Sequence, residues 1–211
     1  MKSKIVDITL VNVTCCKHKK QLIESSDLGM LVEAYLRCYK DSYKIEDLWW
    51  AESSTWEKAL ERAWNSRFCN GKMYSHQCHV AHKLPEGLKI SLDAKVQPSR
   101  FKDFHKLYSW IKSINICIKG LGDTTTYDVA RRLLGVWMRM QPEFVYLHAG
   151  SAKGAKKLGI EGEAVLLSAF PHQIQKLSVT HTENFLCLYK KEIAAITVQN
   201  AIYSNNLSSS E

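Results

Sequence analysis

Two glycines, Gly120 and Gly122, lie in a stretch whose residue types suit an anion. They separate a helical segment that ends near Ile116 from a second one that opens at Asp123 or Thr124. Glycine adopts positive φ and carries no side chain, so a turn built on it can expose its backbone N–H groups. Those groups and the N-terminus of the next helix together favour a phosphate. We therefore predict a phosphate-binding turn here, with a plain helix–helix turn as the alternative.

Nucleotide cofactors do not fit this turn. A P-loop needs a Lys followed by Ser or Thr after its glycines, and a dinucleotide fold needs a strand before them. The sequence has neither feature, so we expect no cofactor. The phosphates of a nucleic-acid backbone remain as the ligand.

The positive charge of the chain points to the same class of partner. The 211 residues include 29 Lys and Arg against 21 Asp and Glu. Twelve basic and four acidic residues lie between positions 95 and 160, which accounts for the whole net charge of +8. Such a window favours a polyanionic partner, of which nucleic acid is the commonest, although a solvated basic face is the alternative. The predicted DNA contacts are Lys119, Gly120, Leu121, Gly122, Asp123, Thr124, Arg131, Arg132, Lys153 and Lys156, with both arginines facing solvent.

Residues 115–160 resemble the helix-hairpin-helix DNA glycosylases related to endonuclease III. The family's hairpin has the sequence Leu-Pro-Gly-x-Gly before a helix, and here Lys119 stands in place of the proline. A Val-Asp-x-His element then opens a basic helix in the family. Residues 145–148, Val-Tyr-Leu-His, occupy that place here with about four extra residues between the two motifs. The stretch from Gly71 to Gln77 is similar to one in uncharacterised bacterial proteins, which suggests a divergent bacterial branch.

The resemblance implies an enzyme that binds duplex DNA, flips a base out of the helix and excises it. The base would be a damaged one or a modified base of phage DNA. Thr124 stands where bifunctional members have a lysine nucleophile, so the implied activity is a monofunctional DNA glycosylase without lyase chemistry. Tyr146 stands at the family's essential aspartate. A non-catalytic DNA-binding module is therefore a second hypothesis, and a structural helical protein is a third.

Three residues are candidates for the chemistry of excision. Asp128 lies on the helix after the turn and could replace the missing acid. Tyr146 could stack on an extruded base, and His148 could orient a phosphate or a water. The bland alternatives are a surface acid, a packed aromatic ring and a histidine at a helix end.

Histidines and cysteines suggest no metal centre and no disulfide framework. His76, His79 and His82 are spaced three apart, but no second pair of ligands has metal-binding spacing, so we predict no metal. Seven cysteines without a C-x-x-C motif favour reduced thiols in the cytoplasm, where DNA would hold the protein at the nucleoid. No apolar run is long enough to span a membrane, and we expect a monomer.

Periodicity predicts a mostly helical, compact fold with two lobes. Helices are expected at 27–40, 101–116, 125–140 and 162–169. Three more are expected from their N-terminal signals, which are a Ser54-x-x-Glu57 capping box, a Ser151 cap and a Thr180-x-x-Glu183 capping box. Residues 69–99 carry Gly and Pro and are expected to be irregular, with a short helix at 76–83. One strand is expected in the first dozen residues.

The predicted domains are an N-terminal helical lobe at 1–100, a helix-hairpin-helix lobe with C-terminal helices at 101–200, and a disordered tail at 201–211. Together these features define an all-α fold class that contains a helix-hairpin-helix DNA-binding motif.

Overall fold

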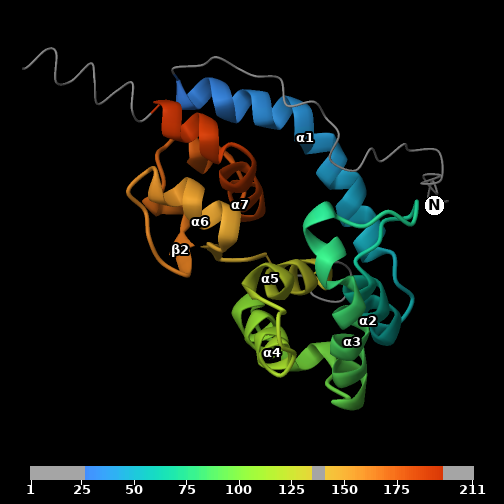
Figure 1. The fold of residues 1–211 in the computed structure, drawn as a ribbon. Helices are drawn as coiled ribbons and strands as arrows, with labels where there is room; N and C mark the ends of the chain where they lie inside the picture. The colour runs from blue at the N-terminus through green and yellow to red at the C-terminus, as the bar shows by residue number, and fades with distance from the viewer. Residues whose placement is uncertain (1–26, 135–140, 197–211) are drawn as a thin grey trace, which may run out of the picture. The chain divides into compact units, whose positions relative to one another are not determined.

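A computed structural model describes residues 27–134 and 141–196 of the chain (Figure 1). The described part is mostly helical, which confirms the helical expectation. Its contacts divide it into two compact units, and we describe each by itself. Of the described residues, unit 1 contains 40–134 and 141, and unit 2 contains 27–39 and 142–196. The division falls within the first helix and near residue 141, whereas the sequence placed a boundary near residue 100. The expected N-terminal strand and C-terminal tail lie outside the described residues.

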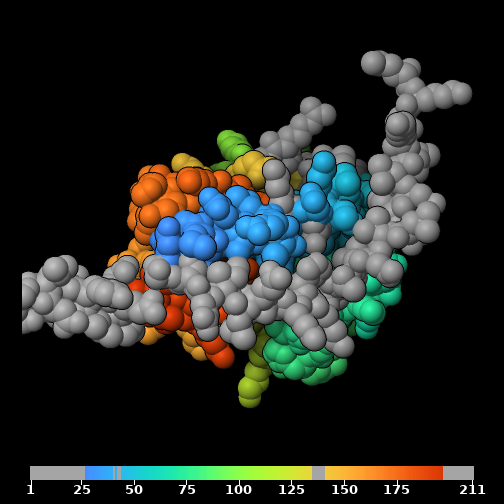
Figure 2. Space-filling model, turned by 90° about the horizontal axis from the view of Figure 1, so that it is seen from above, coloured from blue at the N-terminus to red at the C-terminus, as the bar shows by residue number. Residues whose placement is uncertain are grey.

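The first helix is longer than its periodicity indicated. Helix α1 spans Leu28–Ala51, and its first half belongs to unit 2 and its second half to unit 1. Met30 and Leu48 are exposed on it, and the helix forms part of the face drawn in Figure 2. No helix in the described part of the chain is both long and apolar enough to cross a membrane.

Unit 1 is built from helices that pack in pairs. After α1 come α2 (Trp56–Asn65), the 3-10 segment η2 (Ser75–Lys83), α3 (Leu84–Asp93), α4 (Phe104–Ile116) and α5 (Asp123–Arg132), with a short η3 at Pro98–Arg100. Helix α2 packs on α3, and α4 packs on α5. The helix predicted at 125–140 thus starts two residues earlier and ends at Arg132, and residues 135–140 lie outside the described part.

Helix α3 lies within the stretch that was predicted to be irregular, so that expectation was wrong. Pro85 occupies the first turn of the helix, where its missing N–H has no helical acceptor to lose. Position 87, inside the helix, accepts a glycine because a Cβ there would lie 2.3 Å from the Trp64 ring. The Trp64 indole N–H donates to Ser91 Oγ at 2.8 Å, which joins α2 to α3. Pro85 and Gly87, which suggested a loop, therefore have other roles: Pro85 begins the helix, and Gly87 allows α3 to pack closely on Trp64.

The helix starts differ from the predicted capping boxes by one or two residues. Thr55, not Ser54, caps α2 by accepting from Lys58 N–H at 3.2 Å. Ser178, not Thr180, caps α7 by accepting from His181 N–H at 3.3 Å. Asp103 caps α4 through Lys106 N–H at 2.8 Å. Each cap is an oxygen on a residue with extended backbone, as helix N-termini require.

Unit 2 combines helices with one small antiparallel sheet. Strand β1 (Phe144–Tyr146) pairs with β2 (Ala164–Leu166), with Val145 opposite Val165. The sheet replaces the helix expected at 162–169, because β2 meets the backbone hydrogen-bonding groups of β1 instead of forming its own turns. Between them lies α6 (Ala149–Lys156), and η4 (Leu167–Ala169), η5 (Ile174–Lys176) and α7 (Val179–Leu188) follow.

Helices α6 and α7 touch through glycines. A Cβ on Gly154 would come within 2.3 Å of the Leu186 carbonyl oxygen, and a Cβ on Gly150 within 2.3 Å of Cys187 Sγ. The α6 helix begins after His148, not at Ser151 as expected. Ser151 lies at its third position, where Oγ accepts from the His148 backbone N–H at 3.0 Å.

Candidate functional site

The turn between α4 and α5 depends on Gly120. Its φ of +95° lies in the region that glycine tolerates and other residues rarely adopt. Ile118 anchors the turn in the core, and its carbonyl accepts from Leu121 N–H at 3.1 Å. Asn115 Nδ2 donates to Thr126 Oγ1 at 2.8 Å and so joins the two helices beneath the turn. The predicted turn is therefore a compact connection with an exposed tip.

The N-terminus of α5 is open at its cap. Gly122, not Asp123 or Thr124, is the N-cap residue, and no side chain caps the helix there. Gly122 is exposed, and a Cβ on it would meet nothing within 4 Å. The first N–H groups of a helix lack helical acceptors and carry the positive end of its dipole. This end of α5 can therefore accept an anion from solvent.

Lys83 is the basic residue that the structure places against the turn, and the sequence analysis missed it. Its Nζ donates to the Lys119 carbonyl oxygen at 2.6 Å. The same Nζ lies 2.3 Å from where a Cβ of Gly120 would be. Lys83 comes from the end of η2, 36 residues before Lys119, and nothing in the local pattern indicates this contact.

The other predicted contacts at the turn are mixed in exposure and charge. Lys119 is exposed, and Leu121 and Thr124 are half-buried. Asp123 is exposed at the first position of α5, where its carboxylate lies 3.8 Å from Lys112 Nζ. The ammonium groups of Lys83, Lys112 and Lys119 thus outweigh the one carboxylate around the turn.

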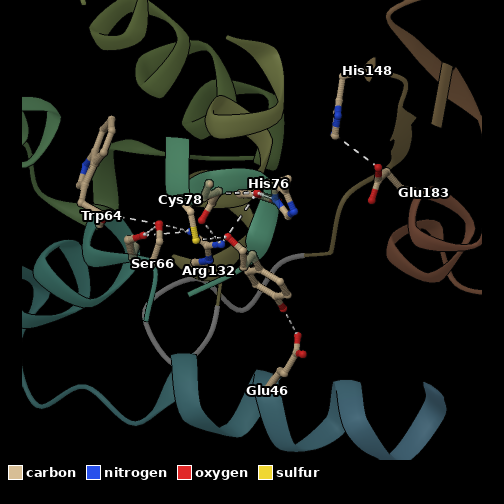
Figure 3. A network of polar contacts seen from close by, with 12 residues as sticks. Glu46, Trp64, Ser66, His76, Cys78, Arg132, His148 and Glu183 are labelled. Carbon is tan, nitrogen blue, oxygen red and sulfur yellow. Dashed lines mark hydrogen bonds and ion pairs between the residues drawn. The ribbon is translucent and has the colours of Figure 1, made fainter. Parts of the chain in front are cut away.

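Arg132 is buried, which corrects the expectation that it faces solvent. Its side chain is 2% exposed. The guanidinium donates to the Ala63 carbonyl at 3.2 Å, to Ser66 Oγ at 2.6 Å and to Gln77 Oε1 at 2.9 Å. Figure 3 shows Arg132 beside Ser66. It holds α5 to α2 and η2 and is not available to a DNA phosphate.

Arg131 is also engaged within unit 1. Its side chain is 12% exposed, and one guanidinium nitrogen lies 3.0 Å from the Asp47 carboxylate on α1. The two arginines therefore connect α5 to other elements of its own unit. The exposed basic residues near the turn lie at its tip instead.

Asp128 lies beside Arg132 in a set of polar residues that we call the Arg132 cluster: Ser66, His76, Gln77, Asp128 and Arg132. The Asp128 carboxylate accepts from Gln77 Nε2, lies 2.9 Å from His76 Nε2 and lies 3.8 Å from Arg132. The side chain of Asp128 is 19% exposed and that of His76 is 48% exposed. Asp128 therefore holds an imidazole at the surface of unit 1.

A buried acid, Glu46, lies on α1 near the Arg132 cluster. The Tyr74 hydroxyl donates to the Glu46 carboxylate. Burial raises the pKa of Glu46, although Arg131 opposes the shift. Burial and the neighbouring Glu46 raise the pKa of Tyr74 well above its usual range. Burial lowers the pKa of Arg132, and Asp128 offsets part of that effect. The charged side chains in this region therefore interact with one another inside unit 1.

The remaining predicted site residues belong to unit 2. Tyr146 is 2% exposed and lies on β1 in the core of the unit. His148 is buried, with Nε2 3.5 Å from the carboxylate of the equally buried Glu183, a pair that Figure 3 also draws. Lys153 and Lys156 are exposed on α6, and Lys156 lies 3.2 Å from Glu161. Asp128 belongs to unit 1, so the candidate acid and these residues come from different units.

The three histidines of η2 do not form a metal centre with their neighbours. His76 binds Asp128, and His79 and His82 are exposed. In the described ranges 27–134 and 141–196, no group of three or more His, Cys, Asp or Glu side chains is arranged to hold a metal ion.

Comparisons with known proteins add no relative. No protein-family model matches the chain, and neither the curated proteins nor the solved structures contain a match. The geometry of unit 1 offers two features for chemistry. One is the exposed glycine turn with the open N-terminus of α5, and the other is the pair of Asp128 with His76.

Proposed function

We propose that the protein binds double-stranded DNA by gripping a backbone phosphate at the α4–α5 turn, as a helix-hairpin-helix motif does. The observation that carries the proposal is the open N-cap of α5 at the exposed Gly122. Gly120, Gly122 and Asp123 are exposed, so this end of the helix meets solvent. A phosphate there would meet backbone N–H groups and the positive end of the helix dipole.

Three lysines support a polyanion at this place over a small neutral ligand. Lys83 lies against the turn, Lys119 is exposed on it, and Lys112 lies near Asp123. Contacts of this kind position a protein on DNA without choosing a sequence. The proposed binding is therefore electrostatic and weakly sequence-dependent, and it should weaken steeply as salt rises.

The sharpest test replaces Gly122 by aspartate. The residue has φ −120° and ψ −173°, a conformation that any residue adopts, and there is open space for a side chain. Aspartate is a preferred N-cap, so Gly122→Asp should keep or slightly raise the thermal stability. Its carboxylate would occupy the anion site, so duplex affinity should fall at least tenfold. Gly122→Asn is the matched control, because it caps the helix in the same way without the negative charge.

Fluorescence anisotropy of a labelled duplex, titrated between about 50 and 200 mM salt, measures both affinity and salt slope. The wild-type protein should lose affinity steeply over this range. Equal duplex binding by the wild type and Gly122→Asp would refute the turn as the phosphate site. Absence of any salt-sensitive binding by the wild type would instead favour the structural helical protein.

A second candidate is the monofunctional DNA glycosylase, and the pairing of Asp128 with His76 favours it. Asp128 lies on α5, six residues after Gly122, and its partner imidazole is half exposed. Such a pair can take a proton from water as the water oxygen bonds to the sugar C1′ and the N-glycosidic bond breaks. The leaving base then takes up that proton, giving a free base and an abasic sugar. A damaged or modified base would be extruded for this step.

This chemistry is tested by incubating the protein with duplexes that carry damaged and modified bases and with modified phage DNA, followed by alkali. Abasic sites should form in at least one lane. His76→Gln and Asp128→Asn should abolish them without weakening duplex binding, whereas Asp93→Asn, at the end of α3, should leave the yield unchanged. Salt-sensitive binding with no abasic product would leave the non-catalytic DNA-binding module.

A further inference from the structure

A pocket on unit 1 lies apart from the turn and uses none of its residues. It has a volume of about 470 Å³ and is lined by Trp49, Lys58, Glu61, Arg62, Asn65, Arg67 and Phe68. That volume lies within the roughly 300–1,000 Å³ typical of small-ligand sites. Its walls are the last turns of α1, one side of α2 and the segment after α2.

The planar groups of the pocket are held in place by backbone carbonyls. The Trp49 indole N–H donates to the Arg67 carbonyl at 3.0 Å. Arg62 donates to the Trp49 carbonyl, and its guanidinium lies over the Trp49 ring at 3.9 Å. Arg67 in turn donates to the Gly71 carbonyl at 2.8 Å. The indole and both guanidinium groups are therefore ordered before any ligand arrives.

The charge of the lining favours an anion. Lys58, Arg62 and Arg67 supply three positive charges against the single carboxylate of Glu61. Each arginine directs one donor at a backbone carbonyl, and the Glu52 carboxylate interacts with Arg62 from beside the pocket. A guanidinium has five N–H donors, so both arginines keep further donors for a ligand. Arginine and tryptophan planes also stack on nucleobases, whatever the base. A ligand that combines a phosphate with a flat ring matches both properties.

We propose that this pocket binds a nucleotide unit, with its base stacked on Trp49 or Arg62 and its phosphate bound by Lys58 and Arg67. The nucleotide can come from an unpaired end or gap in a nucleic-acid strand, or it can be a free mononucleotide. An acidic peptide matches the charge but not the ordered flat surface, so we favour the nucleotide. The assignment does not depend on the α4–α5 turn.

The main test uses a labelled single-stranded decamer of deoxythymidine and the full chain. Lys58→Gln/Arg67→Gln should weaken binding about tenfold. It should lower the slope of log affinity against log salt by about 0.7, since the two side chains bind one phosphate and each phosphate contact on a single strand contributes roughly 0.7. Lys89→Gln/Lys102→Gln, which removes two exposed charges elsewhere in unit 1, should leave affinity within about twofold. The single variant Lys58→Gln changes only an exposed side chain, so it checks the pocket if the double variant unfolds.

Competition experiments separate the base from the charge and the two sources from each other. A decamer of abasic sugar phosphates should bind about tenfold more weakly than the deoxythymidine decamer, because stacking is lost. Deoxythymidine monophosphate that displaces the decamer would identify a free mononucleotide as a sufficient ligand; failure to displace it would assign the pocket to strands.

Three results would overturn the proposal: equal binding by wild type and Lys58→Gln/Arg67→Gln, equal binding of the abasic decamer, or displacement by poly-glutamate as effective as by the decamer. Gly122→Asp should lose duplex binding and keep binding of the deoxythymidine decamer. Failure of the pocket and failure of the turn are thus distinguishable.

Discussion

Arg132 illustrates how a residue's chemistry depends on what surrounds it. Its place on α5 after a glycine turn suggested a phosphate contact, and so did its neighbour Arg131. The fold instead surrounds its guanidinium with the Ala63 carbonyl, Ser66 and Gln77, and with the carboxylate of Asp128. A buried cation costs free energy unless it is fully paired, and here each partner offsets part of that cost.

Arg132→Ala should therefore reduce the free energy of unfolding by about 3–5 kcal/mol, because it leaves buried partners without their donor. Urea unfolding followed by circular dichroism measures the change. Arg100→Ala, at an exposed position, is the control and should stay within about 0.5 kcal/mol of wild type. A loss below 1 kcal/mol for Arg132→Ala, which is about the scale of one ordinary hydrogen bond, would contradict the buried role.

Glu46 gives a pH-dependent prediction. Because burial raises its pKa in the folded protein, the folded state holds its proton to higher pH than the unfolded state does. Stability therefore falls as pH rises through the window above the unfolded pKa. Glu46→Gln keeps an oxygen that can accept from the Tyr74 hydroxyl, but its amide does not titrate. The variant should gain stability relative to wild type as pH rises above the ordinary glutamate pKa of about 4.3. Urea unfolding across that range measures the difference, and a difference that shrinks as pH rises would refute the assignment.

At the scale of elements, the ends of the helices decide what the turn can do. Serine or threonine caps α2 and α7, whereas α5 begins at a glycine with no capping side chain. Helix α3 also lacks a capping side chain, but α5 follows the positive-φ Gly120, beside which Lys83 donates to the Lys119 carbonyl. The turn therefore combines an open helix end with a backbone conformation that other residues would not adopt at the same cost.

Gly120→Ala and Gly122→Ala should differ sharply. Alanine at position 120 must adopt a φ near +95° and displace the Lys83 ammonium. We expect a loss of about 1–2 kcal/mol for the backbone strain alone. Alanine at position 122 has an ordinary φ and open space, so its effect should stay within about 0.5 kcal/mol. Thermal unfolding of the two variants compares them, and equal melting temperatures would show that the turn is not strained by a side chain at 120.

At the scale of the molecule, the basic window is shared by two units. Lys119 and its neighbours at the turn belong to unit 1, whereas Lys153 and Lys156 belong to unit 2. Arg131 and Arg132 are engaged inside unit 1 and add little to any surface. The basic residues behind the net charge of +8 are therefore divided between the two units, and the charge still favours an anionic partner.

Each unit should respond first to damage in its own core. Gly154→Ala places a methyl group against the Leu186 carbonyl and forces α6 from α7, at a cost of about 1–3 kcal/mol. In hydrogen exchange, amides of residues 142–196 should lose protection while those of residues 52–132 keep it. Arg132→Ala should have the reverse effect. Equal loss in both units for either variant would show that they unfold as one.

The helices could be predicted largely from the sequence, because apolar spacing and local caps act within a few residues. The stripe from Phe104 to Ile111 and the Gly-x-Gly turn belong to this group, and the structure has both a helix and a turn there. Helix α3 was missed because proline and glycine are common in loops, whereas here Pro85 lies in the first turn of a helix and Gly87 packs against Trp64.

What only the tertiary structure decided depends on residues far apart in the chain. Lys83 reaches the turn across 36 residues, and Arg132 meets Ser66 across 66. Strands β1 and β2 exist because each satisfies the other's backbone groups. Such contacts leave no periodic pattern in the sequence, since they are selected by burial and hydrogen bonding once the helices pack. The sequence by itself predicted most of the helices and the Gly-x-Gly turn, because apolar spacing and glycine act locally. The packing decided which of the basic residues remain at the surface, because burial and ion pairing depend on residues far apart in the chain.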